Sequence, residues 1–408
     1  VGKFVGTGGL AAVGATGTIN FLIIGCLLGL TTGFTVLTSQ KFGAGRMSEM
    51  RKTVGNAAIL SAVIAVIMTA VSMLGMHRLL IFMNTPEDIF DGAYGYIMII
   101  CGGIFTQVLY NLVSSILRAL GNSKTPLYFL ILAAGLNIVL DLVFIIVFHF
   151  GAPGAAWATV ISQGVSGLLC LIYIRKRVPE LRMDREDWRF DPNIAKKQIS
   201  VGIPMGLQYS ITAIGTMMVQ SSLNILGSGA VAAFTAGSKI ENIFTQAFVA
   251  LGTTMSTYNA QNIGARQLDR VRRGFRAADV IGCIYAVAVG FILFYAGKYF
   301  SYLFISDNAD VVIPMVDVYL QCVGMFMIPL YVVNCYRNGF QGMGYGLLPM
   351  LSGVAELFGR GVMAIVAAHK QSYRMACMAS PFAWIVATAL LILLYFYVMK
   401  DMKKKLCL

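Results

Sequence analysis

The chain has 408 residues, of which 58% are hydrophobic and 12% are charged, and its formal net charge is +13. This composition excludes an ordinary soluble domain, in which charged residues make up about 25%. The positive charge does not indicate nucleic-acid binding, because the basic residues form short clusters between apolar stretches and not one polar face. We therefore expect a protein of the lipid bilayer, with no nucleic acid as a partner.

Eleven apolar stretches are long enough to cross a bilayer as α-helices, which need about 20 residues each. In chain order they cover 10–38, 54–80, 90–117, 126–148, 152–174, 198–224, 230–258, 277–299, 311–339, 349–368 and 374–398. The pattern predicts an all-α integral membrane protein. Basic clusters occupy alternate connections and the C-terminal end, including 175–197, 266–276 and 400–405. By the positive-inside rule we expect these connections and the C-terminus to be cytoplasmic, in a bacterial plasma membrane, and the acidic connections 84–88 and 306–310 to lie outside.

The chain contains an internal repeat. Residues 10–44 return in diverged form, with residue 11 aligned with residue 232, an offset of 221 residues. Gln40 and Gly43 align with Gln261 and Gly264 at this offset. In an apolar chain, a repeat of this length indicates two homologous helical lobes around a central pathway, the plan of many secondary transporters.

The repeat divides the chain into an N-terminal lobe at 1–175, a charged cytoplasmic linker at 176–197 and a C-terminal lobe at 198–408. Shifted back by 221 residues, the span 198–224 would fall almost wholly before residue 1. We therefore expect an additional first helix, upstream of this sequence, and six helices in each complete lobe.

Several motifs resemble those of the multidrug and toxic compound extrusion (MATE) transporters, and the resemblance covers essentially the whole chain. The motifs are the two Gln-x-x-Gly-Ala loops at Gln40 and Gln261, Arg118-Ala-Leu-Gly-Asn122, Asn137-Ile-Val-Leu-Asp141, Gly154-Ala-Ala-Trp-Ala-Thr159 and Gly202-Ile-Pro-Met205. The resemblance implies an exporter of cationic and amphipathic compounds that is driven by entry of protons or sodium ions. It implies no other cofactor.

Asp141 is the most informative polar residue at membrane depth, because a carboxylate near a helix centre costs about 2.5 to 3.5 kcal/mol on insertion scales. Asn137 lies one turn earlier, where its amide could bond the carboxylate. This Asn-x-x-x-Asp pair resembles the cation-linked pair of some family members, which implies a coupling role; the alternative is that Asp141 ties helices together. Asn111 and Thr159, on neighbouring spans, are candidate cavity partners.

The second half carries Lys239 and Glu241, where the first has Thr18 and Asn20. A carboxylate facing a central cavity would favour cationic substrates, so we assign Lys239 and Glu241 to a candidate substrate cavity. The alternative is that each pairs with another helix.

Other residues indicate structural roles. Glu356 and Arg360 are four positions apart and can form a structural ion pair. Pro329, in the span 311–339, predicts a helix kink that is either a hinge or a static bend. Asp279 falls toward the end of its span, where we expect water to solvate it. The scattered His and Cys residues predict no metal site.

The sequence therefore predicts a cation-coupled antiporter and not an enzyme, with small organic molecules as its ligands and no obligate protein partner. One alternative is a flippase for a lipid-linked saccharide. It would need a strongly basic cavity, and Lys239 and Arg360 are the basic residues expected near membrane depth. The other alternative is a membrane enzyme, which would need clustered His, Asp or Ser groups at one interface, and the sequence contains no such cluster.

Overall fold

The computed structural model describes residues 6–83, 85–302 and 309–407. Every regular element in these ranges is helical, and the chain forms two compact units, Val1–Gly206 (unit 1) and Leu207–Leu408 (unit 2). The division falls inside one helix, α7 (Pro192–Leu226). The lobe boundaries at 175 and 198, like the expected helix before residue 1, stay predictions.

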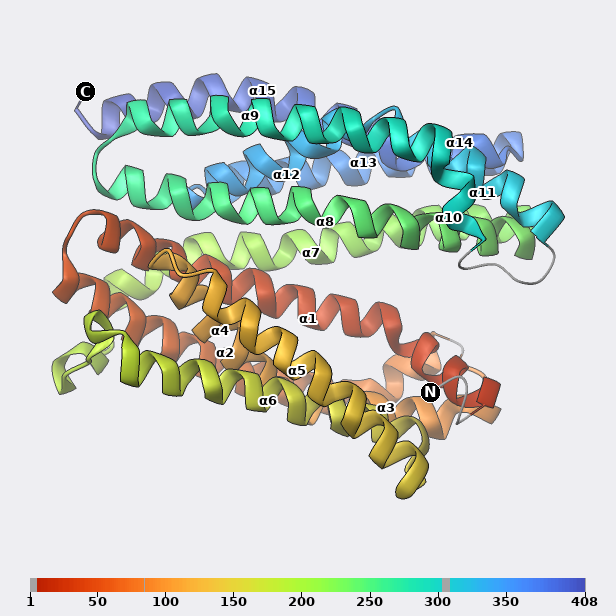
Figure 1. The fold of residues 1–408 in the computed structure, drawn as a ribbon, viewed down its shortest axis with the longest axis horizontal. Coiled ribbons are helices and arrows are strands. Elements are labelled where there is room, and N and C mark those ends of the chain that lie inside the picture. The colour runs from red at the N-terminus through yellow and green to blue at the C-terminus, as the bar shows by residue number, and fades with distance from the viewer. Residues whose placement is uncertain (1–5, 84, 303–308, 408) are drawn as a thin grey trace. The chain divides into compact units, whose positions relative to one another are not determined.

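Unit 1 consists of long helices joined by short turns (Figure 1). They are α1 (Gly6–Gly43), α2 (Met47–Phe82), α3 (Glu87–Gly102), α4 (Ile104–Ala119), α5 (Lys124–Leu142) and α6 (Gly151–Arg177). A π-helical turn at Val143–Val147 extends α5, and the linker after α6 forms two 3₁₀ turns, Pro179–Leu181 and Arg185–Trp188. In Figure 1 this linker and the α1–α2 turn lie at the same end of unit 1.

Unit 2 contains the remainder of α7 and the helices that follow it. They are α8 (Ser228–Gly264), α9 (Leu268–Phe291), α10 (Gly297–Ser301), α11 (Ala309–Gly324), α12 (Met327–Gly342), α13 (Leu347–Lys370), α14 (Tyr373–Cys377) and α15 (Ala379–Lys405). A π-helical turn at Ile292–Ala296 joins α9 to α10. Most of the acidic connection predicted at 306–310 lies outside the described residues.

Each of the eleven predicted spans coincides with a helix or with consecutive helices. In the described part of the chain, seven helices are long and apolar enough to cross a membrane, or nine if each of two bent pairs is one span. The two other predicted spans correspond to α7 and α8, which are long but rich in Ser, Thr, Asn and Gln. Polar helices in a bilayer normally face other helices or a water-filled path, so α7 and α8 are expected to contribute to the interior of the protein.

Both bent pairs break at equivalent positions of the repeat. The α3–α4 pair bends by 46° at Gly103, and the α11–α12 pair bends by 54° directly after Gly324, which is Gly103 plus the offset of 221. Pro329 lies in the first turn of α12, where the backbone N–H that proline lacks would have had no acceptor within the helix. Its equivalent in unit 1 is Val108, so the bend forms there without a proline.

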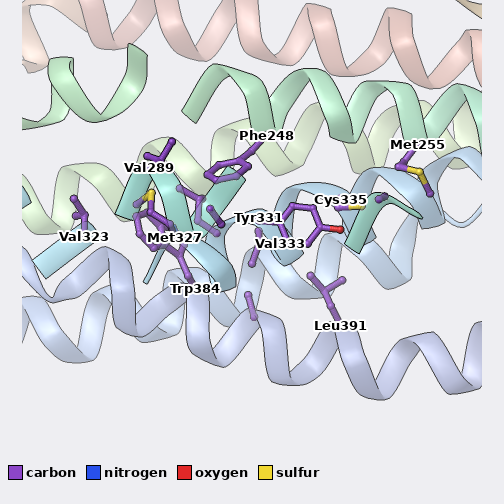
Figure 2. Packing of buried hydrophobic residues seen from close by; sticks show 14 of the residues in the cluster. Phe248, Met255, Val289, Val323, Met327, Tyr331, Val333, Cys335, Trp384 and Leu391 are labelled. Atoms are coloured by element: carbon purple, nitrogen blue, oxygen red, sulfur yellow. The ribbon is translucent and has the colours of Figure 1, made fainter. Parts of the chain in front are cut away.

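The largest apolar core lies in unit 2 and joins α8, α9, α11, α12 and α15. Figure 2 shows Phe248, Val289, Tyr331 and Trp384 packed together in it. The ring of Tyr331 lies directly over Gly282 of α9, where an added Cβ atom would be 2.0 Å from the ring carbon Cε2. Glycine is therefore required at this crossing of α9 and α12.

Candidate functional site

Asp141 lies in the last turn of α5, half-buried, with its Oδ1 atom enclosed and without a hydrogen-bond partner. Asn137 does not satisfy this atom. Its Nδ2 atom points to Oγ1 of Thr159 on α6 at 3.5 Å, while that hydroxyl donates to the carbonyl of Ala155 at 2.9 Å. The structure thus brings Asn137 and Thr159 together, but the amide–carboxylate bond expected from the sequence is replaced by a contact between helices.

The backbone changes its winding immediately after Asp141. The π-helical turn at Val143–Val147 includes a bond from the N–H of Phe148 to the carbonyl of Val143 at 3.1 Å. Such wide turns are rare within α-helices and frequently occur at functional sites. Asp141 also interacts electrostatically with Tyr96 of α3. The carboxylate therefore lies next to an irregular point of the helix.

Amide side chains on three helices of unit 1, α1, α4 and α6, share the incomplete hydrogen bonding of Asp141, as Oε1 of Gln198 on α7 also does. The atoms without partners are Oδ1 of Asn20 on α1, Nδ2 of Asn111 on α4 and Oε1 of Gln163 on α6. Their helices pack on one another in unit 1. An unsatisfied buried polar group costs about 1–3 kcal/mol, so a water molecule or a substrate would stabilise such groups, and a cation would stabilise the oxygens among them. Asn111 was predicted from the sequence and Gln163 was not, although an amide inside an apolar span is the signal that identifies both.

In unit 2, Glu241 of α8 accepts a hydrogen bond from the hydroxyl of Tyr319 on α11. Ser238 donates to the same tyrosine oxygen at 3.2 Å, and Arg360 of α13 interacts electrostatically with the carboxylate. Lys239 is exposed and has no ion pair among the described residues. Residues two positions apart project from different faces of a helix, so the fold does not bring Lys239 and Glu241 together.

Glu356 and Arg360 form an ion pair, with Oε2 of the glutamate 3.3 Å from Nη2 of the arginine. Arg337 of α12 is a second partner of Glu356, and its Nε atom donates to Oγ of Ser352 at 2.9 Å. All three charged side chains are at most 10% exposed, and Nη1 of Arg360 has no hydrogen-bond partner. Two buried cations therefore share one carboxylate.

The burial of Arg337 was not predicted. From the sequence, Lys239 and Arg360 were the only basic residues expected near membrane depth, and Arg337 must be added to them. Position 337 lies two residues before the end of its predicted span, so the sequence alone gave no indication of its burial. The surroundings of Asp279 also differ from the expectation that water solvates it. Its two carboxylate oxygens accept bonds from the hydroxyls of Tyr331 at 2.9 Å and Tyr336 at 3.0 Å, so α12 supplies partners that the sequence did not indicate.

No group of three or more His, Cys, Asp or Glu residues that could hold a metal ion occurs in the described ranges. The polar sites are therefore suited to binding ions or small molecules through carboxylates, amides and hydroxyls. They do not contain the clustered nucleophile and base that a hydrolytic enzyme requires.

The comparisons with known proteins agree on one family. The MatE family model matches residues 1–143 and 204–366. The probable multidrug resistance protein YpnP of Bacillus subtilis is 33% identical over 353 residues, which cover 86% of this chain and 78% of that protein. The probable multidrug resistance protein NorM of Thermotoga maritima is 27% identical over 352 residues, which cover 84% and 74%. An outward-facing multidrug resistance MATE transporter of known structure matches in fold with a TM-score of 0.93 at 23% identity, over 98% of this chain and 90% of that one.

Proposed function

Because the chain belongs to the MatE family, the multidrug and toxic compound extrusion transporters, we propose that it exports drug-like organic molecules by cation-coupled antiport. Protons or sodium ions that enter from outside bind in unit 1, and this binding favours the state that releases substrate. Substrate and cation then occupy the transporter in turn. A few kcal/mol of differential affinity between the two states is enough for this exchange.

The observation that carries this proposal is the enclosed, unpartnered Oδ1 atom of Asp141. A proton or a sodium ion would stabilise an oxygen that no protein group satisfies. Asn137, Thr159 and Asn111 provide amide and hydroxyl oxygens on α4, α5 and α6, and oxygen ligands are those that a hard cation prefers. These groups are consistent with either ion.

Cationic or amphipathic substrates are supported by Glu241. The hydroxyl of Tyr319 donates to this carboxylate, and a donor stabilises the charged form that would attract an organic cation. Lys239 is two residues away on another face of α8 and does not neutralise it, and Arg360, which interacts with it electrostatically, already forms an ion pair with Glu356. We propose that Glu241 contributes to substrate selection.

A flippase for an anionic, lipid-linked substrate is the second candidate, and one observation favours it. Arg337 and Arg360 share the single carboxylate of Glu356, which leaves a buried excess of positive charge. An exporter of cations has no obvious need for this excess. Export of a cationic dye, tested against movement of a lipid pyrophosphate between leaflets, separates the two functions.

We propose that the protein lies in a bacterial cytoplasmic membrane with its C-terminus inside. The basic α1–α2 turn and the basic linker lie at one end of unit 1 (Figure 1), as the positive-inside rule requires of two cytoplasmic connections. In unit 2 the α8–α9 turn and the end of α15 likewise lie at one end.

Efflux of ethidium from cells that express the chain tests the proposal. We expect efflux that depends on the proton or sodium gradient in the wild type and is lost with Asp141→Asn. Asp317→Asn is the matched control, because Asp317 is a half-buried carboxylate of unit 2 that accepts a bond from Gln321 at 2.9 Å. Gradient-driven efflux that persists in Asp141→Asn would contradict the assignment of the coupling site.

A further inference from the structure

The linker between α6 and α7 is docked on α2 by buried polar contacts. Asp187, with a side chain 5% exposed, accepts a hydrogen bond from Nε of Arg51 at 3.1 Å. Asn56 of α2 is fully buried; it donates to the carbonyl of Arg189 at 3.3 Å and accepts the N–H of Asp191 at 2.9 Å. The contacts satisfy both side-chain and backbone groups, so the linker is a built part of unit 1 and not a free tether.

A direct backbone approach accompanies these bonds. An added Cβ atom at Gly55 of α2 would lie 2.1 Å from the carbonyl oxygen of Asp187, closer than any real Cβ contact. Glycine at this position therefore allows the linker backbone to lie against the helix. The docked segment is fixed beside residues 51–56 of α2.

Helix length places this segment near the surface of the bilayer. The 36 residues of α2 extend over about 54 Å, whereas the hydrocarbon core is about 30 Å thick. A centred helix would extend about 12 Å beyond the core at each end. Residues 51–56 lie about 6 to 14 Å from the start of α2, so the docked linker is at the depth of the lipid headgroups.

Docking through Asp187 leaves the neighbouring side chains pointing away from the protein. Trp188 is 50% exposed and Phe190 is 53% exposed, although both are large and apolar. Three exposed arginines make no ion pair within the described ranges: Arg182, Arg185 and Arg189. Aromatic rings beside free arginines at headgroup depth form a surface suited to a membrane interface.

We propose that this surface, formed by Trp188, Phe190 and the three arginines, binds the headgroups of anionic phospholipids. Between residues 175 and 197 the chain has eight Lys or Arg and five Asp or Glu. Glu180, Asp184 and Glu186 lie among the three arginines, and Asp187 is already bound to Arg51, so the excess comes from the basic residues at both ends of the segment. The remaining positive charge complements lipid phosphate, which arginine can bind through two parallel hydrogen bonds. Trp188 and Phe190 enter the interface beside these phosphates and fix the depth of the linker. The role is separate from cation coupling and from substrate binding.

The fluorescence of Trp188 tests this proposal in the complete chain. The protein has three tryptophans, so Trp157→Phe with Trp384→Phe leaves Trp188 as the reporter. The variant is placed in nanodiscs of phosphatidylcholine or of phosphatidylglycerol, each with a nitroxide-labelled headgroup lipid as quencher. We expect stronger quenching in phosphatidylglycerol, and weaker quenching when the salt concentration is raised.

Replacing two arginines measures the charge contribution. With Arg185→Gln and Arg189→Gln, we expect the ratio of lipid-bound to water-exposed Trp188 to fall about 30-fold, equal to about 2 kcal/mol. Lys403→Gln with Lys404→Gln is the control, because it removes the same charge from the exposed end of α15.

Three results would overturn the proposal. One is equal quenching in the neutral and the anionic lipid. Another is equal loss of quenching in the arginine variant and in the lysine control. The third is quenching of Trp188 by acrylamide that is as strong in phosphatidylglycerol nanodiscs as in phosphatidylcholine nanodiscs, which would leave the residue equally exposed to water in both.

Discussion

Glu356→Gln removes the carboxylate that two buried arginines share. In the wild type Glu356 is 5% exposed, and its Oε1 and Oε2 atoms bind Arg337 and Arg360, which are 9% and 10% exposed. Without it, two cations remain in the interior with no acidic partner. Breaking a buried pair in this way costs about 3–5 kcal/mol. For a unit of this size, such a loss lowers the melting temperature by about 10 °C.

Thermal unfolding of the detergent-solubilised protein at one scan rate measures the effect. Asp317→Asn is again the control, and we expect a loss of only about 1 kcal/mol because that carboxylate has one neutral partner. Adding Arg337→Gln to Glu356→Gln removes one uncompensated cation, so the double variant should lose less than the sum of the single losses. A melting temperature within about 2 °C of wild type for Glu356→Gln, or strict additivity in the double variant, would refute this reasoning.

Three further predictions concern unit 2. Tyr319→Phe removes the donor to Glu241, and we expect it to lower stability by about 1–3 kcal/mol; an unchanged melting temperature would contradict the hydrogen bond. Gly282→Ala forces a Cβ atom against the ring of Tyr331, so we expect a loss of about 1–3 kcal/mol in the same assay, and full stability would show that the helices can separate at no cost. Cys407 is the exposed member of the described cysteines, so a maleimide should modify the folded protein there first; mass spectrometry that finds rapid modification at the buried Cys335 would contradict the packing.

The succession of helices along the chain was predictable, because bilayer thickness sets a minimum length for an apolar span. The cause of the two bends was harder to predict from the sequence. Pro329 predicted a kink in the span 311–339, and the helix does break just before it. The equivalent break at Gly103 has no proline, however, so the bend belongs to the repeated fold and not to one residue. The rule that proline kinks a helix therefore located the bend in the span 311–339 but does not explain the equivalent bend at Gly103.

Polar residues were predictable where they interrupt apolar sequence, as Asp141 and Glu241 do. Their partners were not, because hydrogen bonds such as that of Glu241 to Tyr319 join residues 78 positions apart. The contacts of charged segments were hidden for the same reason. The composition of the linker predicted a charged cytoplasmic connection, and it gave no indication that Asp187 is buried against Arg51, 136 positions away. Pairing across such separations is decided by the fold and leaves no local pattern.

Transport by the purified protein in liposomes tests the coupling of export to cation entry at Asp141 most directly. A proton gradient and a sodium gradient are imposed separately, and movement of a fluorescent organic cation is followed in wild type and in Asp141→Asn. We expect one of the two gradients to drive the dye in the direction opposite to the ion, and the substitution to abolish this movement. Dye movement that responds equally to the gradient in both proteins would contradict this expectation.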